Sequence, residues 1–328
     1  SMFDFKHDKM NTESEAYFAD GTFDLSDRTR LSLGLRRTTD EFTSKQDNFI
    51  SILMPAPVIA AQTCDREVVT EYSSTTSRAV IQHDLTSGSN VYASLSEGFK
   101  AGGYATYECT EPYDPEEVTS LEFGYKGSLG ENTSLNASLF RYDYTDFQVL
   151  QVVGIQTVTR NAGDATVNGL ELEALSNLND SLSMSYGLTL LDATYGEFLN
   201  TNGLEPQLGQ QQLEGKYLNN APKVSVNLGL NYTTNLSSGS SLTYRANAAY
   251  KSKIYFSEFN EYSQSAYTIV DLNLIWESAD DRMRTRFYVK NATDEEYISG
   301  YLSSATGGGR FGQWGYPRTA GIEIQRNF

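Results

Sequence analysis

The sequence has only two histidines and two cysteines among its 328 residues, so it offers few side chains for acid–base catalysis or transition-metal binding. His83 shares one face of a predicted strand with apolar residues and is interpreted as an ordinary strand residue, while His7 lies among mixed charges near the start. No glycine-rich phosphate loop opens a helix, and no cysteine and histidine spacing of the zinc-binding type occurs. We therefore predict no enzyme, no cofactor and no metal site.

Long apolar runs are also missing. The longest, residues 52–61, contains Pro55 and Pro57 and is interpreted as a loop, whereas a membrane helix needs about 18 or more apolar residues in succession. The mean hydropathy is −0.44. Any membrane-spanning part must therefore consist of strands, in which apolar and polar residues alternate and the mean hydropathy stays low.

Basic residues are outnumbered, with 25 Lys and Arg against 42 Asp and Glu and a net charge of −17. Binding to nucleic acid needs clustered basic residues, so no nucleic-acid partner is expected. The carboxylates of 108–117 and 294–296 are interpreted as solvated loops in preference to cation sites.

Aromatic residues are abundant, with 22 Tyr and 16 Phe but only 2 Trp, and much of the chain shows a period of two. In residues 283–290 one face is less polar and the other is charged or aromatic. The first face carries Met283, Thr285, Phe287 and Val289, and the second Arg284, Arg286, Tyr288 and Lys290. This pattern predicts a strand between an apolar and a polar environment.

The pattern repeats and predicts about thirteen strands. A long loop is expected at 40–74, and a change of phase within a long strand at 134–153 indicates a bulge or the point at which that strand leaves the membrane. Short turns are expected at every second connection, near Ser26, Ser87, Gly130, Asn179, Ser238 and Asp280. The connections between them are mostly long. This alternation is typical of an all-β, antiparallel transmembrane β-barrel, with short periplasmic turns and long extracellular loops.

Charged residues of both signs lie on the polar face and are predicted to line a wet or plugged lumen. The alternative is the solvated side of a soluble antiparallel sheet. These residues are Arg36, Glu122, Lys126, Glu171, Glu173, Arg245, Asp271, Arg284, Arg286 and Lys290.

Four segments in order resemble the C-terminal part of a TonB-dependent outer-membrane receptor. They are 92–103 (YASLSEGFKAGG), 122–127 (EFGYKG), 161–173 (NAGDATVNGLELE), and 288–297 (YVKNATDEEY) with the end of the chain from Pro317 to Phe328. The resemblance runs over nearly the whole chain and implies a single domain, 1–328, that holds about thirteen strands of a 22-stranded barrel. It also implies a bacterial outer-membrane location in contact with lipid.

The family's N-terminal plug, its TonB-contacting segment and its earlier strands are not found in the sequence, and no export signal is present, so we expect a fragment or a processed form. The resemblance implies a TonB complex as partner, reached through the missing plug. It also implies recognition of Phe328 by the barrel-assembly machinery, although Arg326 stands where that signal usually has a hydrophobic residue.

Aromatic and basic residues on the predicted long loops are the candidates for binding a bulky solute; packing between loops is the alternative. They are Tyr104, Tyr107, Tyr113, Tyr255, Phe256, Phe259, Tyr301, Arg310, Phe311 and Trp314. Arg310 would suit an anionic ligand such as a ferric chelate. Cys64 and Cys109 are expected in long loops on the same side, where an exported protein could pair them or keep two free thiols.

The resemblance implies a receptor that binds a scarce solute and imports it by TonB-dependent transport. A ferric siderophore is the first expectation, and cobalamin, haem and oligosaccharides remain open. The alternatives are a passive porin or surface-binding barrel without energy coupling, and a soluble carbohydrate-binding β-protein.

Overall fold

The computed structural model describes residues 9–52, 59–86, 88–104, 112–153, 156–161, 163–202, 204–304 and 309–328. Thirteen strands form one antiparallel sheet in which each strand pairs with the next one in order. They are β1 (Lys9–Ser26), β2 (Thr29–Ile52), β3 (Ile59–Thr86), β4 (Ser89–Lys100), β5 (Glu116–Leu129), β6 (Thr133–Thr145), β9 (Ala165–Asn179), β10 (Leu182–Tyr195), β13 (Val224–Asn235), β14 (Ser241–Lys251), β17 (Tyr267–Glu277), β18 (Met283–Lys290) and β21 (Thr319–Arg326). The predicted antiparallel, all-β architecture is confirmed.

The remaining elements lie in connections between these strands and form two-stranded pairs and one short helix. They are β7 (Gln148–Val153) with β8 (Gln156–Asn161), β11 (Leu199–Thr201) with β12 (Gln210–Gln212), the 3₁₀ helix η1 (Pro206–Leu208), β15 (Ile254–Tyr255) with β16 (Ser263–Gln264), and β19 (Ile298–Ser304) with β20 (Gly309–Trp314). No helix in the described ranges is long and apolar enough to cross a membrane.

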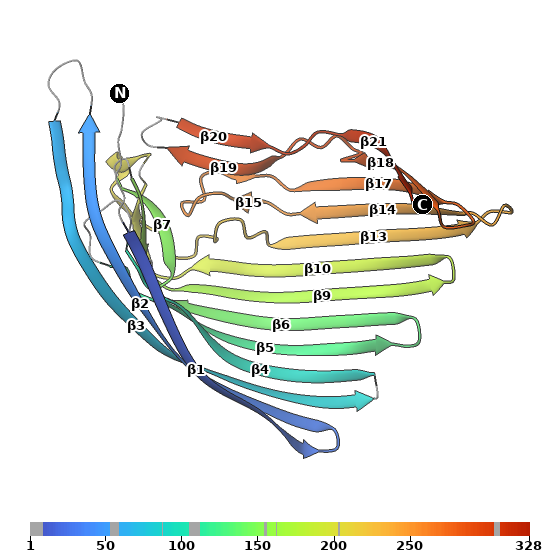
Figure 1. Cartoon of the computed structure of the whole chain (residues 1–328), viewed down its shortest axis with the longest axis horizontal. Helices are drawn as coiled ribbons and strands as arrows, with labels where there is room; N and C mark the ends of the chain where they lie inside the picture. Colours follow the sequence, from blue (N-terminus) through green and yellow to red (C-terminus); the bar gives the residue numbers. More distant parts are fainter. Residues whose placement is uncertain are drawn as a thin grey trace.

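The curved sheet has two different ends (Figure 1). The turns that join β1 to β2, β5 to β6, β9 to β10, β13 to β14 and β17 to β18 are short and gather at one end, on the right of the figure. Several of them need a left-handed backbone, which Gly130 (φ 67°), Gly239 (φ 82°) and Asp281 (φ 55°) supply. The connections that carry the short elements lie at the opposite end, here called the loop end.

The prediction of a long loop at 40–74 is wrong. β2 continues to Ile52 and β3 begins at Ile59, with residue-for-residue pairs such as Thr43↔Val69 and Lys45↔Glu67. Both strands rise well past their neighbours at the loop end (Figure 1). Polar residues predominate in their outer parts, and the adjacent Val68 and Val69 lie on opposite faces. These parts therefore lack the alternation by which a strand is recognised. Cys64 consequently lies within β3 and not in a loop.

The prediction of a single long strand at 134–153 is also wrong. β6 ends at Thr145, and Asp146 adopts a left-handed conformation (φ 52°) that separates it from the β7–β8 pair. The bulge proposed for the change of phase is absent, because β6 pairs without a register shift with both β5 and β9. Phe140 and Tyr142 instead turn toward the polar face and stack there, with ring centroids 4.8 Å apart.

The register gives the sheet one apolar and one polar face. A continuous row of paired residues crosses seven strands on the apolar face: Leu31, Ile81, Ala93, Phe123, Leu139, Leu170 and Leu190. Large side chains in this row are well exposed, with 51% of Phe123 and 58% of Leu139 accessible. Such exposure of a broad apolar surface is untenable in water and ordinary in lipid.

On the polar face, aromatic rings lie across glycines of the neighbouring strand. A Cβ atom at Gly124 would overlap the Tyr92 ring, and one at Gly169 would overlap the Phe140 ring. Each glycine is therefore the only residue that leaves room for its neighbour's ring. The Tyr92 hydroxyl donates a hydrogen bond to the Glu122 carboxylate, and the Lys126 ammonium lies 5.2 Å from the Tyr92 ring centre.

Candidate functional site

The main buried apolar cluster among the described residues lies at the loop end, not within the sheet. Leu213 is fully buried, and it packs with Val149 of β7, with Tyr195 at the end of β10 and Phe198 just beyond it, and with Phe259. Burial, and then the nearby Glu258 carboxylate, raise the pKa of Tyr195 well above its ordinary value. The cluster joins residues 196–223 to residues 252–266. These two loops and the β19–β20 pair are here called the loop assembly.

Two asparagines of the loop 196–223 form hydrogen bonds with two glutamates of the loop 252–266. The Asn200 side chain donates to Glu258 Oε1 at 3.1 Å, and the Asn202 side chain donates to Glu261 Oε2 at 3.0 Å. Both asparagines are buried. Burial also raises the pKa of the Glu258 carboxyl. These contacts fix the first loop against the second.

Three rings and a guanidinium form a stack on the loop assembly. The Tyr301 ring lies 5.7 Å from Phe256 and 5.2 Å from Tyr262, with interplanar angles of 15° in each case. The Arg310 guanidinium lies 4.3 Å from the centre of the Tyr262 ring and forms an ion pair of 3.3 Å with Glu205. We call Phe256, Tyr262, Tyr301 and Arg310 the ring stack. It combines flat apolar faces with a planar cation.

A second aromatic group joins the first two loops. Tyr217 and Tyr255 stack with ring centroids 5.9 Å apart. The Lys223 and Lys253 ammonium groups lie 4.1 Å and 4.4 Å from the centres of the Tyr217 and Tyr255 rings. A hydrogen bond to the Tyr217 hydroxyl is the main cause that raises the pKa of Lys223.

Tyr104 and Tyr113 belong to a third group near β3 and β4. Tyr104 is buried and its hydroxyl bonds to Thr70, and the Tyr72 hydroxyl donates to the Tyr113 carbonyl at 2.9 Å. Burial and the nearby Tyr104, Asp114 and Tyr113 raise the pKa of Tyr72 to about 12.

The predicted ligand-binding residues therefore divide by environment. Phe256, Tyr301 and Arg310 meet in the ring stack, Tyr255 pairs with Tyr217, and Phe259 is buried in the apolar cluster. Phe311 and Trp314 are 55% and 66% exposed on β20. Tyr107 lies outside the described residues, so the structure gives no view of it.

Sequence reasoning missed Tyr262, Tyr217 and Glu205. They stand in loops, where no period marks which side chains will meet. The structure does not test whether Cys64 and Cys109 form a disulfide or remain free thiols. Cys109 lies outside the described residues, and only the backbone of Cys64 is described.

Strand alternation places all ten predicted lumen charges on the polar face, and two of them, Arg245 and Arg286, form a polar ladder across β13 to β21. Arg245 donates to Asn231 and Arg286 donates to Asn273, both at 2.8 Å, and Arg286 also lies 3.3 Å from Glu323. Their contact with a lumen stays a prediction.

The last residue, Phe328, is fully exposed, and the Arg326 guanidinium lies 5.2 Å from its ring centre. Arg326 pairs with Met283, so its Cβ points to the apolar face. The role of Phe328 in assembly stays a prediction.

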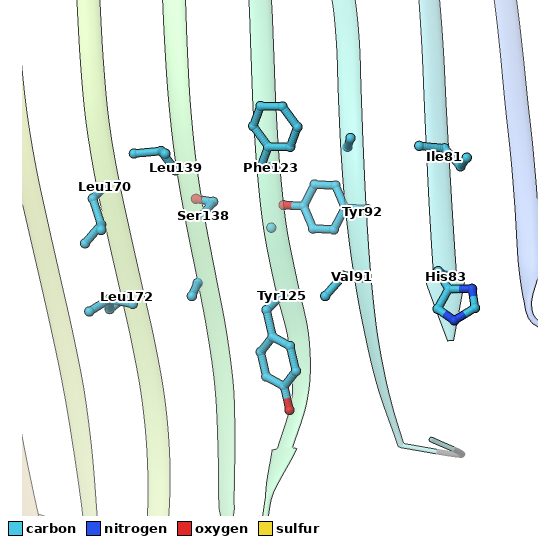
Figure 2. A pocket seen from close by; sticks show the side chains of 13 residues that line it. Ile81, His83, Val91, Tyr92, Phe123, Tyr125, Ser138, Leu139, Leu170 and Leu172 are labelled. Carbon is cyan, nitrogen blue, oxygen red and sulfur yellow. The ribbon is translucent and has the colours of Figure 1, made fainter. Parts of the chain in front are cut away.

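On the apolar side of the sheet, two shallow grooves are lined mainly by residues of the apolar face. Figure 2 shows the residues that line the first, among them Phe123 and Tyr125 of β5 and Leu139 of β6, with His83 at one margin. His83 Nδ1 lies 2.9 Å from the Thr29 hydroxyl. Neither groove contains a cluster of convergent polar groups, and both are part of the apolar face.

A sequential antiparallel sheet with an exposed apolar face, a charged opposite face and turns of unequal length defines a segment of a transmembrane β-barrel. Residues 4–292 match the family model described as TonB dependent receptor-like, beta-barrel. The chain belongs to the β-barrel family of TonB-dependent receptors, and it is an outer-membrane protein.

Among characterised proteins, the chain is 23% identical over 226 residues to the ferrioxamine B receptor of Salmonella typhimurium, covering 68% of this chain and 30% of the receptor. Among solved structures, the ferric yersiniabactin uptake receptor of Yersinia pestis superposes with a TM-score of 0.80 and 22% identity, covering 97% of this chain and 46% of the receptor. A siderophore receptor of Acinetobacter baumannii gives a TM-score of 0.74 and 20% identity, over 96% and 43% of the two chains. This chain thus spans less than half the length of these proteins.

Proposed function

We propose that this chain is the C-terminal part of the barrel of a receptor that binds a ferric siderophore and imports it by TonB-dependent transport. The names of the similar receptors support this choice of solute. The proposal includes the plug and TonB contact outside this segment, assembly of the barrel through Phe328, and no enzymatic activity. Family membership leaves no support for the soluble alternative.

In this proposal the apolar face contacts lipid and the polar face lines the lumen. The β1 and β21 edges each pair on one side only within the described residues, and unpaired backbone groups are costly in lipid. Further strands of a barrel of about 22 strands would cover both edges. The charged ladder of Arg245, Arg286 and Glu323 would then lie in water or against the plug.

The ring stack is the observation that best supports ligand binding at the loop end. It draws residues from two loops that are far apart in the sequence and exposes a guanidinium over an aromatic ring. A ferric siderophore is bulky and often anionic or aromatic, so rings and a planar cation are complementary to it. Arg310 already pairs with Glu205, so an anionic ligand must compete for that ion pair.

The test is uptake of radioactive iron by cells in which the complete receptor is the sole route for the chelate offered. We expect uptake of a ferric hydroxamate, phenolate or catecholate that disappears when TonB is deleted. Tyr301→Ala should weaken binding of the chelate, as measured by fluorescence quenching, while Tyr316→Ala, 85% exposed and outside the ring stack, should not. Uptake that persists without TonB would support a passive barrel instead.

A further inference from the structure

The Tyr217–Tyr255 pair with its two lysines is not part of the ring stack. The two rings are nearly parallel, at 10°, and one ammonium lies over each ring. Lys223 and Lys253 are exposed and form no ion pair with any carboxylate that the structure describes. Each ring of the stacked pair thus carries a positive charge at the surface of an acidic protein. We call these four residues the lysine–tyrosine site.

The site is fixed by hydrogen bonds from its surroundings. Asn260 clamps Tyr217, because its side-chain amide donates to the Tyr217 carbonyl at 2.9 Å and accepts from the Tyr217 amide at 2.8 Å. The backbone N–H of Asn220 donates to the Tyr255 carbonyl at 2.9 Å. Two loops are therefore joined at this point, and the rings are held in position before any ligand arrives.

The site adjoins the apolar face at the loop end. Tyr217 forms a β-bridge with Thr194, and Thr194 lies four residues beyond Leu190 in the same strand. Side chains four apart in a strand share a face, so Thr194 lies on the same face as Leu190, about 13 Å further along. Its paired residue Tyr217 therefore lies on the apolar side as well. Lys223 immediately precedes Val224, the first residue of the apolar row of β13. Tyrosines and lysines in this position are typical of the boundary between lipid and water.

We propose that the lysine–tyrosine site binds the phosphate group of a lipid in the outer leaflet. The two ammonium groups would donate to the phosphate oxygens, the tyrosine rings would pack against the headgroup, and the acyl chains would lie along Leu190, Val224 and Val226. A free phosphate would gain nothing from that adjoining apolar surface. The nearby Asp192 carboxylate disfavours an anion and sets a limit on the affinity.

The proposal needs the apolar face to lie in lipid but does not depend on which solute is imported. The test uses the complete receptor in a neutral detergent, titrated with lipid A that carries two phosphates, with bound lipid counted by native mass spectrometry. We expect a retained lipid whose affinity falls about thirtyfold in the Lys223→Gln/Lys253→Gln variant, at roughly 1 kcal/mol for each lysine near an anionic surface. Lys223→Arg/Lys253→Arg should keep most of the binding.

The matched control is Lys126→Gln/Lys290→Gln. These lysines also lie over tyrosine rings, at 5.2 Å and 5.9 Å, but on the polar face, and their removal changes the charge equally. Equal loss of lipid in both double variants would overturn the proposal, as it would reflect net charge alone. Equal retention of dephosphorylated lipid A, or displacement of the lipid by millimolar inorganic phosphate, would also overturn it. Chelate uptake serves as a separate readout, so a wrong solute leaves this result interpretable.

Discussion

Arg310 on β20 reaches Glu205 beside η1 at 3.3 Å, although 105 positions separate them in the sequence. The same guanidinium lies over Tyr262, so it connects all three parts of the loop assembly. This contact therefore lies on the surface that we propose to bind the ligand.

Loss of the ion pair should loosen the β19–β20 pair without unfolding the barrel. Both side chains are partly exposed, so Glu205→Ala is expected to cost no more than about 1 kcal/mol. Amide hydrogen exchange at 298–302 should accelerate by up to about fivefold, which is the same free energy expressed as a ratio. Asp280→Ala, which removes an ion pair at the opposite end, is the control and should leave exchange at 298–302 unchanged. An equal effect of both variants would contradict a direct link.

Leu213 should be the most sensitive apolar residue of the loop assembly, because its side chain is fully buried among Tyr195, Phe198 and Phe259. Leu213→Ala removes buried methyl groups and leaves a cavity, at a cost of about 2–5 kcal/mol. Limited proteolysis of the folded receptor should then cut within 196–223. Leu208→Ala provides the control, since Leu208 is 55% exposed. If both variants resist proteolysis as well as the parent, the cluster does not hold the loops together.

The strands were predictable where lipid on one side and a polar environment on the other impose a period of two. That condition holds for β10, β13, β14, β17 and β18, and these were found from the sequence. It fails for the outer parts of β2 and β3, where polar residues predominate and the apolar ones do not alternate. These parts were interpreted as a loop. The physical cause is that strand pairing depends on backbone hydrogen bonds, which leave no mark on side-chain polarity.

The candidate site was predictable only as a composition of loop aromatics. Tyr301 and Arg310 were named from the sequence, but their partners Tyr262 and Glu205 were not, because contacts between loops depend on how each loop folds back. Phe259 fits the alternative that the sequence left open, in which aromatic residues pack one loop against another. Burial of Phe259 follows from the fold of two loops around Leu213, which no local pattern encodes.

The glycines beneath the polar-face rings give a test of the sheet itself. Gly169→Ala places a methyl group where the buried Phe140 ring lies, and overpacking of this kind costs about 1–3 kcal/mol. The midpoint of unfolding in urea, followed by heat-modifiable gel migration in micelles, should fall. Gly187→Ala on β10 is the matched control, because its new Cβ would meet Asn227 atoms only at 3.5–3.9 Å, an ordinary contact distance. If the two variants unfolded at the same urea concentration, the Phe140 ring would not pack against Gly169 as described.

Protonation of Glu258 should stabilise the loop assembly. Burial raises the pKa of Glu258 above its ordinary value of 4.5, so the folded loops bind this proton more tightly than unfolded loops do. The stabilisation is complete below pH 4.5 and is lost as the pH rises through the folded pKa. Hydrogen exchange at 196–202, corrected for its intrinsic pH dependence, should therefore show more protection at pH 4.5 than at pH 7.5.

Glu258→Gln separates this effect from general acid effects on the protein. The amide oxygen of glutamine can still accept from Asn200, but it carries no charge to bury. The variant should be better protected than the parent at pH 7.5 and should lose most of the pH dependence. The exposed Glu214→Gln serves as the control and should behave like the parent. If Glu258→Gln is less protected than the parent at pH 7.5, the ionised carboxylate stabilises the loops, and burial is not the dominant influence on Glu258.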